Sequence, residues 1–350
     1  MARVLQTNFA GPLVCLWGKR MWYDINRPLT YNEPFNMILG GRGIGKSYAW
    51  KKKAIKDFLK NGKQFGYIRR YDSELKEVQE TFFSDIIFNA EFPETVIKFE
   101  RGVWLVNGKL AGYPFALTRT KDYKSSSYPR VCNLLFDEFL VEHGKSGYLK
   151  KEPFKVFDLY ETIARMRENV ILFMMANTIS KANPYFLEWD LIPQKEKEFI
   201  VKNHILLQVV PVDKEFKGKK ESTKFGEMVR ALGYADYSID ANFYQDDVIQ
   251  TFDKTKNSRF LFAFVWRGKT YGFWMDWESG YCIISYSYDK YTSLIFTFDK
   301  GSINATVNYI ENFKNHPYIK RMKDSFCKGT LRYDNERISL ELKEMLSILL

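Results

Sequence analysis

The stretch Gly-Gly-Arg-Gly-Ile-Gly-Lys-Ser at residues 40–47 constrains the fold of this chain more than any other. It fits the phosphate-binding pattern of a glycine, four residues and then Gly-Lys-Ser/Thr, which connects a buried strand to a helix. The apolar residues 35–39 predict that strand, and residues 47–60 predict the helix. The loop is therefore predicted to bind the phosphates of a nucleotide. The alternative is a glycine-rich turn without a ligand.

Each part of this loop has an expected task. Glycines let the backbone N–H groups turn inward onto a phosphate, and the helix N-terminus adds positive potential. Lys46 would reach the β- and γ-phosphates, while the Ser47 hydroxyl would bind Mg²⁺. The loop residues expected to hold the nucleotide are Gly40, Gly41, Arg42, Gly43, Ile44, Gly45, Lys46 and Ser47.

Two adjacent acids, Asp137 and Glu138, follow the apolar residues 131–136, which predict another buried strand. A strand that ends in two acids is commonly just solvated, but downstream of a phosphate loop the pair predicts a hydrolytic site. Asp137 would lie near Mg²⁺, and Glu138 would polarise the attacking water. The pair is typical of ASCE-type ATPases, which carry an extra strand between the two motifs and use a glutamate base. ATP and Mg²⁺ are thus the expected ligands.

Three further residues could complete this site. Asn177 follows the apolar residues 169–176, where a polar side chain could sense the γ-phosphate or simply form a turn. Arg165 and Arg167 lie near the end of a helix predicted over residues 155–168, and their spacing points them to different faces. One of them could stabilise the charge on the transferred phosphoryl group, often from a neighbouring subunit. The alternative is an arginine that complements the helix dipole.

The composition sets the class of protein. At 350 residues the chain exceeds the size at which one hydrophobic core keeps growing, so two domains are expected. The net charge of +11 favours a polyanionic partner, although a soluble basic protein can carry the same charge without one. The four cysteines have neither disulfide-like nor zinc-like spacing. Every apolar stretch is shorter than the roughly 20 residues that span a bilayer, so a soluble, intracellular protein with no membrane partner is expected.

Strand-like and helix-like segments alternate between residues 35 and 176, which predicts an α/β domain with a largely parallel sheet covered on both faces. Residues 96–117 predict a small antiparallel insertion. Farther along, residues 214–224 have the charge of a linker or exposed loop, and residues 260–298 alternate aromatic and polar side chains as in a β-meander. Helices are predicted over residues 303–315 and 335–349.

With these residues in view, the chain resembles the family of DNA-packaging ATPases, or encapsidation proteins, of phi29-like small tailed phages. The resemblance runs from about Asn36 to the C-terminus, and several of its motifs are not generic to ATPases. They are Gly-Gly-Arg-Gly-Ile-Gly-Lys-Ser-Tyr-Ala at 40–49, Tyr-Ile-Arg-Arg-Tyr at 67–71, Asn-Gly-Lys-Leu-Ala-Gly at 107–112, Phe-Asp-Glu-Phe at 136–139, Arg-Met-Arg-Glu at 165–168, Asn-Pro-Tyr-Phe at 183–186 and Leu-Arg-Tyr-Asp at 331–334.

The resemblance implies three parts and a set of partners. The parts are a P-loop ATPase domain with an N-terminal extension over residues 1–208, a partly helical linker over 209–247 and a smaller α+β domain over 248–350. The last is implied to be RNase H-like, nuclease-derived and inactive. The family further implies a homo-oligomeric ring, a pentamer, that pumps double-stranded DNA into a prohead through its portal (connector) in the host cytoplasm. Some relatives dock on a structural RNA, which is therefore a candidate partner.

Carried over residue by residue, the loop and the Asp-Glu pair keep the roles given above. Arg165 matches the family's arginine that acts on the neighbouring subunit, and Lys124 matches a second basic residue offered between subunits. Arg167 is then the less expected of the two arginines. Lys150 and Lys151 are candidates for contact with the DNA backbone, although an ordinary solvated loop has the same composition.

Two other functions are compatible with these motifs. A metal-dependent nuclease regulated by the ATPase domain would use the acids Asp276, Glu278, Asp289 and Asp299, which would have to converge on paired metal ions. Solvated acids at strand ends are the simpler interpretation. A non-translocating ATPase switch that binds the portal would hydrolyse ATP at a rate indifferent to DNA length.

Overall fold

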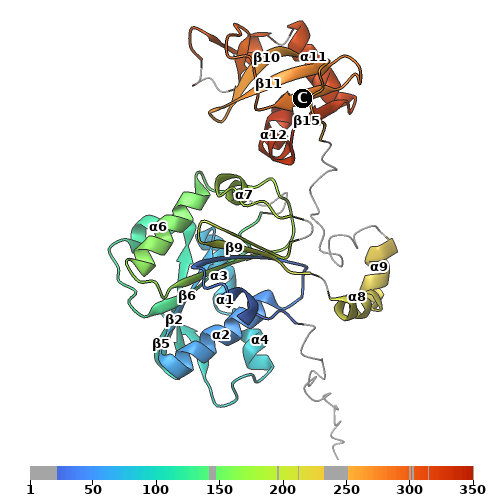
Figure 1. The fold of residues 1–350 in the computed structure, drawn as a ribbon. Coiled ribbons are helices and arrows are strands. Elements are labelled where there is room, and N and C mark those ends of the chain that lie inside the picture. Colours follow the sequence, from blue (N-terminus) through green and yellow to red (C-terminus); the bar gives the residue numbers. More distant parts are fainter. Residues whose placement is uncertain are drawn as a thin grey trace, which may run out of the picture. The chain divides into compact units, whose positions relative to one another are not determined.

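The chain divides into two units, each built on its own sheet (Figure 1). In the computed structural model the described residues are 22–141, 147–194, 197–211, 213–231, 251–298, 301, 303–313 and 315–349. The first unit holds the described residues up to Ser180 and from Leu191 to Ala231, and the second holds Lys181–Asp190 and those from Thr251 onward. The segment 181–190 therefore belongs with the C-terminal part of the chain, which its place in the sequence does not predict.

A sheet of nine strands, counted over the described residues, organises the first unit in the order β3-β4-β5-β2-β6-β7-β1-β9-β8. The strands are β1 Phe35–Leu39, β2 Gln64–Arg69, β3 Ile97–Glu100, β4 Val103–Val106, β5 Lys109–Ala116, β6 Val131–Asp137, β7 Ile171–Ala176, β8 Phe199–Lys202 and β9 Ile205–Val209. The pairings from β5 across to β9 are parallel, whereas β3-β4, β4-β5 and β9-β8 are antiparallel. The predicted parallel sheet and its antiparallel insertion are both confirmed.

Strand β7 lies between β1, which leads into residues 40–47, and β6, which ends in Asp137. This is the extra strand that an ASCE-type ATPase carries between its two motifs. Parallel strands end at the same edge of a sheet, so the residues that follow β1, β6 and β7 come together there. The strand order therefore assembles one site from three separate segments of the sequence.

Helices cover both faces of this sheet. The helical segments of the first unit are α1 Asn26–Leu29, α2 Lys46–Asn61, α3 Asp72–Val78, α4 Ser84–Phe88, η1 Leu117–Arg119, α5 Thr120–Tyr123, α6 Glu152–Ala164, α8 Lys214–Glu221 and α9 Lys224–Ala231. Side chains alternate along β1, so Ile38 lies in the same buried cluster as Trp50 of α2, while Phe35 on the other face contacts Tyr160 of α6. Within the described ranges, no helix is long and apolar enough to cross a membrane.

Aromatic side chains fill the core between α2 and the sheet. Trp50, Phe65, Phe82 and Trp104 are buried, and neighbouring ring centroids lie 5.6–6.3 Å apart. Aromatic pairs at such distances add about 0.5–1.5 kcal/mol each beyond the burial of their area. The cluster therefore fixes α2, and with it the end of the loop that α2 continues.

The second unit has a six-stranded sheet among its described residues, in the order β14-β13-β10-β11-β12-β15. Its elements are α7 Pro184–Glu188, β10 Ser258–Trp266, β11 Lys269–Asp276, β12 Cys282–Ser285, β13 Ile295–Thr297, β14 Val307–Tyr309, η3 Ile310–Phe313, α11 Pro317–Cys327, β15 Leu331–Tyr333 and α12 Glu336–Leu349. Strands β10 to β12 form the predicted meander, and the others pair in parallel. One core joins Phe262 of β10, Met322 of α11 and Leu342 of α12. The RNase H-like character of the second unit stays a prediction.

Two segments differ from the sequence prediction. Residues 214–224, expected to be a linker or exposed loop, contain helix α8, whose first turn Asp213 caps by accepting a hydrogen bond from the N–H of Glu215 at 2.9 Å. A charged composition misleads here, because ion pairs four residues apart support a helix. Residues 303–315, expected to be a helix, hold β14 and a 3-10 turn, because Val307 pairs with Ile295 of β13.

Candidate nucleotide-binding site

The loop at residues 40–47 has the backbone conformation and the close packing that its glycines predict. Gly43 and Gly45 have φ angles of 88° and 86°, in the left-handed region where a side chain is strained. At Gly40 the constraint is space, because an added Cβ would lie 2.8 Å from Cδ1 of Ile44. Lys46 begins α2, so the unpaired N–H groups of the helix N-terminus face the loop. Such a terminus is a ready site for an anion.

Lys46 is buried and folded back over its own loop. Its Nζ donates hydrogen bonds to the carbonyl oxygens of Gly40 at 2.9 Å and Gly41 at 3.0 Å, and to Oδ1 of Asn177 at 3.4 Å. Burial lowers the pKa of Lys46 to about 8, although the Asp137 carboxylate acts in the opposite direction. Asn177 therefore lies in the site, in contact with the lysine.

Ser47 and Asp137 form a pair of oxygen ligands beside the lysine. The Ser47 hydroxyl donates to Oδ1 of Asp137 at 3.1 Å. Burial raises the pKa of the Asp137 carboxyl, and the charge of Arg69 opposes this shift. Mg²⁺ binds oxygen ligands and is usually held by one or two carboxylates together with substrate phosphates. The residues present thus fit a magnesium–nucleotide complex.

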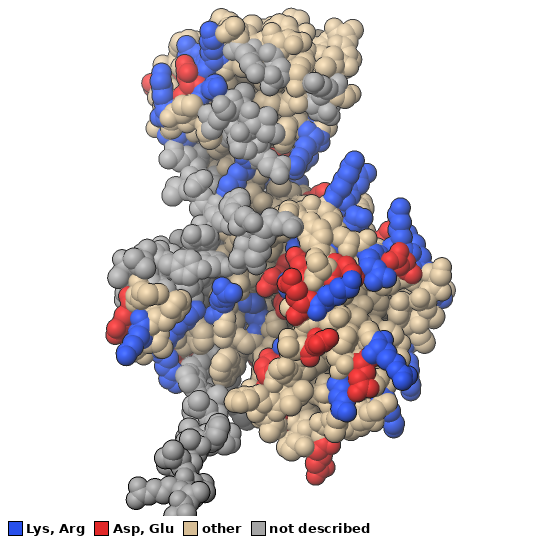
Figure 2. All heavy atoms as spheres, turned by 180° about the vertical axis from the view of Figure 1, so that it is seen from behind, with Lys and Arg blue, Asp and Glu red and all other residues tan. Residues whose placement is uncertain are grey.

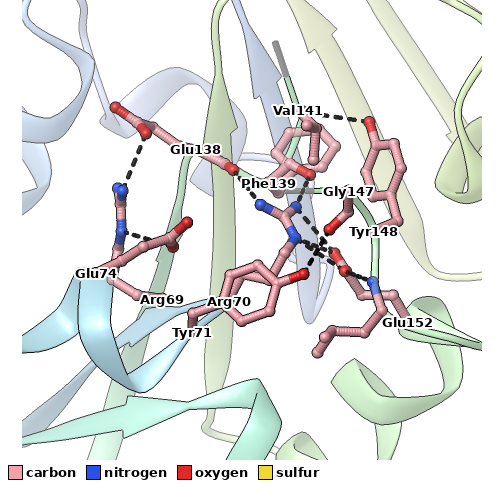
Figure 3. Close-up of polar contacts among 11 residues, drawn as sticks. Arg69, Arg70, Tyr71, Glu74, Glu138, Phe139, Val141, Gly147, Tyr148 and Glu152 are labelled. Carbon is pink, nitrogen blue, oxygen red and sulfur yellow. Dashed lines mark hydrogen bonds and ion pairs between the residues drawn. The ribbon is translucent and has the colours of Figure 1, made fainter. Parts of the chain in front are cut away.

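Glu138 follows β6 in an unusual backbone conformation. Its φ angle is 56°, in the left-handed region that residues other than glycine seldom adopt and that clusters at functional sites. The Glu138 side chain is 55% exposed, and its Oε2 lies 3.0 Å from Nη2 of Arg69 at the end of β2 (Figure 3). Arg69 was not predicted as a site residue. The available signal was a basic pair, Arg69 and Arg70, at the end of a strand that ends at the same edge of the sheet.

Arg70 joins three segments next to Glu138 (Figure 3). Its Nε lies 2.8 Å from Oε2 of Glu152, and its Nη2 donates to the Phe139 carbonyl at 2.6 Å. Glu152, the first residue of α6, is fully buried and also accepts a hydrogen bond from the N–H of Leu149 at 2.7 Å. This buried ion pair ties the segment after β6 to β2 and to α6.

Removing one member of this pair is expected to destabilise the fold strongly. Glu152→Ala leaves the Arg70 guanidinium buried without its carboxylate, so the free energy of unfolding should fall by about 3–5 kcal/mol. Urea denaturation measures the loss. The double variant Arg70→Met with Glu152→Leu buries no charge and should recover most of it. As a matched control, Glu215→Ala breaks an exposed pair with Lys219 and should cost less than about 1 kcal/mol. A double variant as unstable as Glu152→Ala would contradict the explanation.

Arg165 lies at the other edge of the sheet, at the far end of α6. Because β6 and β7 are parallel, α6 runs back from the end of β6 to the start of β7, and its 13 residues span about 20 Å. Arg165 caps this far end and donates to the Ser126 carbonyl at 3.3 Å. Lys124 comes two residues before Ser126 in the sequence, and its Nζ lies 3.3 Å from Oδ2 of Asp158 in α6. The structure therefore places Arg165 far from the loop of its own chain, and Lys124 beside the middle of α6.

Helix α8 packs against the loop, which sequence reasoning missed. Nζ of Lys220 donates to the Arg42 carbonyl at 3.2 Å, and the ring of Phe216 faces Gly43, where an added Cβ would lie 3.9 Å from Cζ. Burial lowers the pKa of Lys220, and the charge of Arg42 acts in the same direction. The Arg42 side chain itself is exposed. Positive charge is thus gathered around the loop in a way that suits a polyphosphate.

The lowered pKa of Lys46 predicts that nucleotide affinity depends on pH. In the protein without nucleotide, the Lys46 ammonium group loses its proton as the pH rises through about 8, and only the charged form attracts phosphate. ATP affinity should therefore be constant below pH 8 and fall above it, by at most about tenfold per pH unit. The lowered pKa of Lys46 also makes the free energy of unfolding depend on pH, but here the effect favours high pH. The stability it contributes is fully present above the ordinary lysine pKa and is lost as the pH falls through about 8.

Titration of the protein with ATP between pH 7 and pH 9.5 checks this expectation. Lys46→Arg is the matched control, because arginine stays charged throughout and its affinity should not change over this range. A wild-type affinity that is as flat as that of the arginine variant would contradict the assignment of Lys46.

Among the described residues, the acids considered for a nuclease site form no cluster that could hold a metal ion. Asp276 is buried, and its oxygens accept hydrogen bonds from the hydroxyls of Thr255 and Ser258 and from the N–H of Ser279. These bonds, that of Thr255 first, hold the pKa of Asp276 well below its usual value. Asp299 lies outside the described residues. Across the part of the chain that the structure describes, no group of three His, Cys, Asp or Glu side chains could hold a metal ion.

Comparison with known proteins gives consistent matches over almost the whole chain. A family model described as Podovirus DNA encapsidation protein (Gp16) matches residues 17–346. The DNA packaging protein of Bacillus phage phi29 is 35% identical over 322 residues, which cover 91% of this chain and 95% of the relative. A solved structure of the bacteriophage phi29 viral genome packaging motor assembly matches with 32% identity and a TM-score of 0.76, covering 94% of this chain and 100% of that chain. The N-terminal domain of the phi29 DNA packaging ATPase matches with 36% identity and a TM-score of 0.52, covering 55% and 98%.

Proposed function

The chain belongs to the Podovirus DNA encapsidation protein (Gp16) family of DNA-packaging ATPase motors, and from this we propose that it hydrolyses ATP to drive double-stranded DNA into a preformed prohead. It acts as a homo-oligomeric ring of five subunits at the portal vertex, in the host cytoplasm. A motor that moves any sequence must contact DNA phosphates rather than bases. On the face that Figure 2 shows, basic side chains lie among acidic ones. The excess of positive charge, +11 for the whole chain, therefore does not form a single basic patch on this face. Lys150 and Lys151, exposed before α6, are candidates for this contact.

The observation that carries the proposal is the convergence of residues 40–47 with the ends of β6 and β7. The loop N–H groups and Lys46 hold the phosphates of ATP. Ser47 and Asp137 would hold Mg²⁺, whose positive charge would offset the negative charge of the phosphates. We assign Asn177 to sensing the γ-phosphate, because its amide oxygen already contacts Lys46.

Glu138 is the proposed general base. Its carboxylate accepts the proton of the attacking water while the water oxygen bonds to the γ-phosphorus and ADP leaves. Arg69 supports this role, because its contact at 3.0 Å orients an otherwise exposed side chain beside the loop. The left-handed backbone of Glu138 also turns this residue out of the line of β6.

Arg165 and Lys124 are proposed to act on the site of the neighbouring subunit. The support for Arg165 is distance, since about 20 Å of α6 separates it from the edge that carries its own loop, beyond the reach of an arginine side chain. Head-to-tail contacts between identical subunits close into a ring and set one edge of each subunit against a different surface of the next. The neighbour's arginine then stabilises the charge on the transferred phosphoryl group.

ATP hydrolysis by rings assembled on proheads, with short and with long duplex DNA, tests the proposal. A translocase should hydrolyse more ATP for each DNA molecule as the duplex lengthens, and Lys46→Ala should abolish hydrolysis on both. If the amount of ATP hydrolysed for each DNA molecule is the same for both lengths, the result supports the ATPase switch instead. Metal-dependent cleavage of the DNA by the wild type would support the nuclease.

A further inference from the structure

The turn that presents Arg165 is built in a strained conformation. Arg165 has φ 52° and ψ −118°, a combination that a residue with a side chain seldom adopts. The next residue, Met166, is 96% exposed, so neither burial nor packing of its side chain holds the turn. Strain of this kind persists only where surrounding contacts fix the backbone. Such contacts must therefore come from elsewhere in the turn.

Arg167 supplies them. Its Nη1 donates to the carbonyls of Pro129 and Val131, both at 2.9 Å, and its Nη2 donates to those of Tyr128 at 3.0 Å and Ile163 at 2.7 Å. All four N–H bonds of the two terminal nitrogens are thus used on backbone oxygens. The carbonyls belong to the last turn of α6 and to the segment that enters β6. One guanidinium therefore clamps the end of α6 to the start of the strand that carries Asp137 and Glu138.

We infer that Arg167 is the positioning residue for Arg165: its clamp holds the 165–167 turn so that the Arg165 guanidinium stands out toward the neighbouring subunit's nucleotide. This inference rests on the proposed function, in which Arg165 acts between subunits. The clamp needs the planar fork of arginine, because a lysine amine is a single point that cannot reach four carbonyls arranged on two sides. Arg167 is itself too engaged to serve as the trans-acting arginine.

A positioning role for Arg167 differs from a merely structural one in the site that its loss affects. Loss of the clamp should damage the neighbour's site and leave the variant subunit's own site intact. Arg167→Ala and Arg167→Lys should each lower kcat of the assembled ring about 100-fold, the size of effect that a misplacement of about 1 Å produces, with KM for ATP unchanged. Arg130→Ala is the matched control, because Arg130 is an exposed arginine of the same segment, and it should keep the wild-type rate.

Mixed rings test the direction of the effect. Arg167→Ala mixed with Glu138→Gln should regain activity above either variant alone, because an Arg167→Ala subunit keeps its own base and receives Arg165 from a Glu138→Gln neighbour. Arg167→Ala mixed with Arg165→Ala should not regain activity, because both fail as donors. The reference mixture is Arg165→Ala with Glu138→Gln, whose failure to recover would overturn the intersubunit role of Arg165 itself.

Three results would overturn the role of Arg167 while that reference mixture recovers. They are a wild-type kcat in Arg167→Ala rings, no recovery when Arg167→Ala is mixed with Glu138→Gln, and a wild-type kcat in Arg167→Lys rings. Thermal unfolding and ATP affinity of the separate subunits show whether Arg167→Ala is folded. If Arg167→Ala is not folded, the same mixtures made with Arg167→Lys decide whether Arg167 positions Arg165 or has no such role.

Discussion

Glu138→Gln is expected to lower kcat for ATP hydrolysis roughly 10²–10⁴-fold while ATP still binds, because the amide cannot accept the proton of the attacking water. Glutamine has nearly the same shape and can still accept a hydrogen bond from Arg69, so the strained backbone at position 138 should survive the change. Pre-steady-state hydrolysis and equilibrium binding of ATP, measured on the same preparation, separate the chemical step from nucleotide affinity.

Glu74→Gln is the matched control for this variant. Glu74 lies 3.7 Å from Nε of the same Arg69 but belongs to α3 and not to the segment that follows β6. It should keep the wild-type kcat within about twofold, the difference expected when a partly exposed ion pair is lost. If Glu138→Gln loses ATP affinity as completely as it loses kcat, Glu138 supports the fold of the site and is not its base.

Arg165→Ala is expected to lower kcat of the assembled ring about 10³–10⁵-fold, the contribution of an arginine that stabilises the charge on a transferred phosphoryl group. Separate subunits should bind ATP as well as the wild type, because Arg165 stands at the far edge of its own sheet. When variant subunits are titrated into wild-type rings, each should silence one neighbouring site, so the rate should fall with the fraction of variant from the first addition.

Arg101→Ala provides the comparison for this titration, since Arg101 is an exposed arginine in the turn between β3 and β4. Rings doped with it should hydrolyse ATP at the wild-type rate at every ratio. Full activity in rings made only of Arg165→Ala subunits would show that the site is completed without this residue.

Much of the site could be predicted because parallel strands end at one edge. A glycine loop after one strand and an Asp-Glu pair after another must meet there, whatever the intervening chain does. The order of β1, β7 and β6 then follows from the type of acid pair. Asn177 was predicted for the same reason, since it also follows a buried strand of this sheet, and its Oδ1 accepts a hydrogen bond from Lys46.

Other contacts could not be predicted because they join side chains across long separations and are decided by packing. The partner of Glu138 is Arg69, and the partner of Arg70 is Glu152, yet nothing in the segment around any of them specifies the other. Helix α8 was missed for a different reason. A lysine- and glutamate-rich segment has the same composition whether it is a solvated loop or a capped helix. Contacts with the loop, such as that of Lys220 with the Arg42 carbonyl, show where α8 lies.

Lys46 donates hydrogen bonds to the carbonyl oxygens of Gly40 and Gly41, so this side chain helps to hold the loop in its conformation. The ammonium group that is proposed to bind the phosphates of ATP is therefore also a structural part of the loop. Replacing Lys46 removes both contributions, because the two carbonyl oxygens lose a donor while the site loses a positive charge. Weaker ATP binding in Lys46→Ala would thus have a conformational part as well as an electrostatic part.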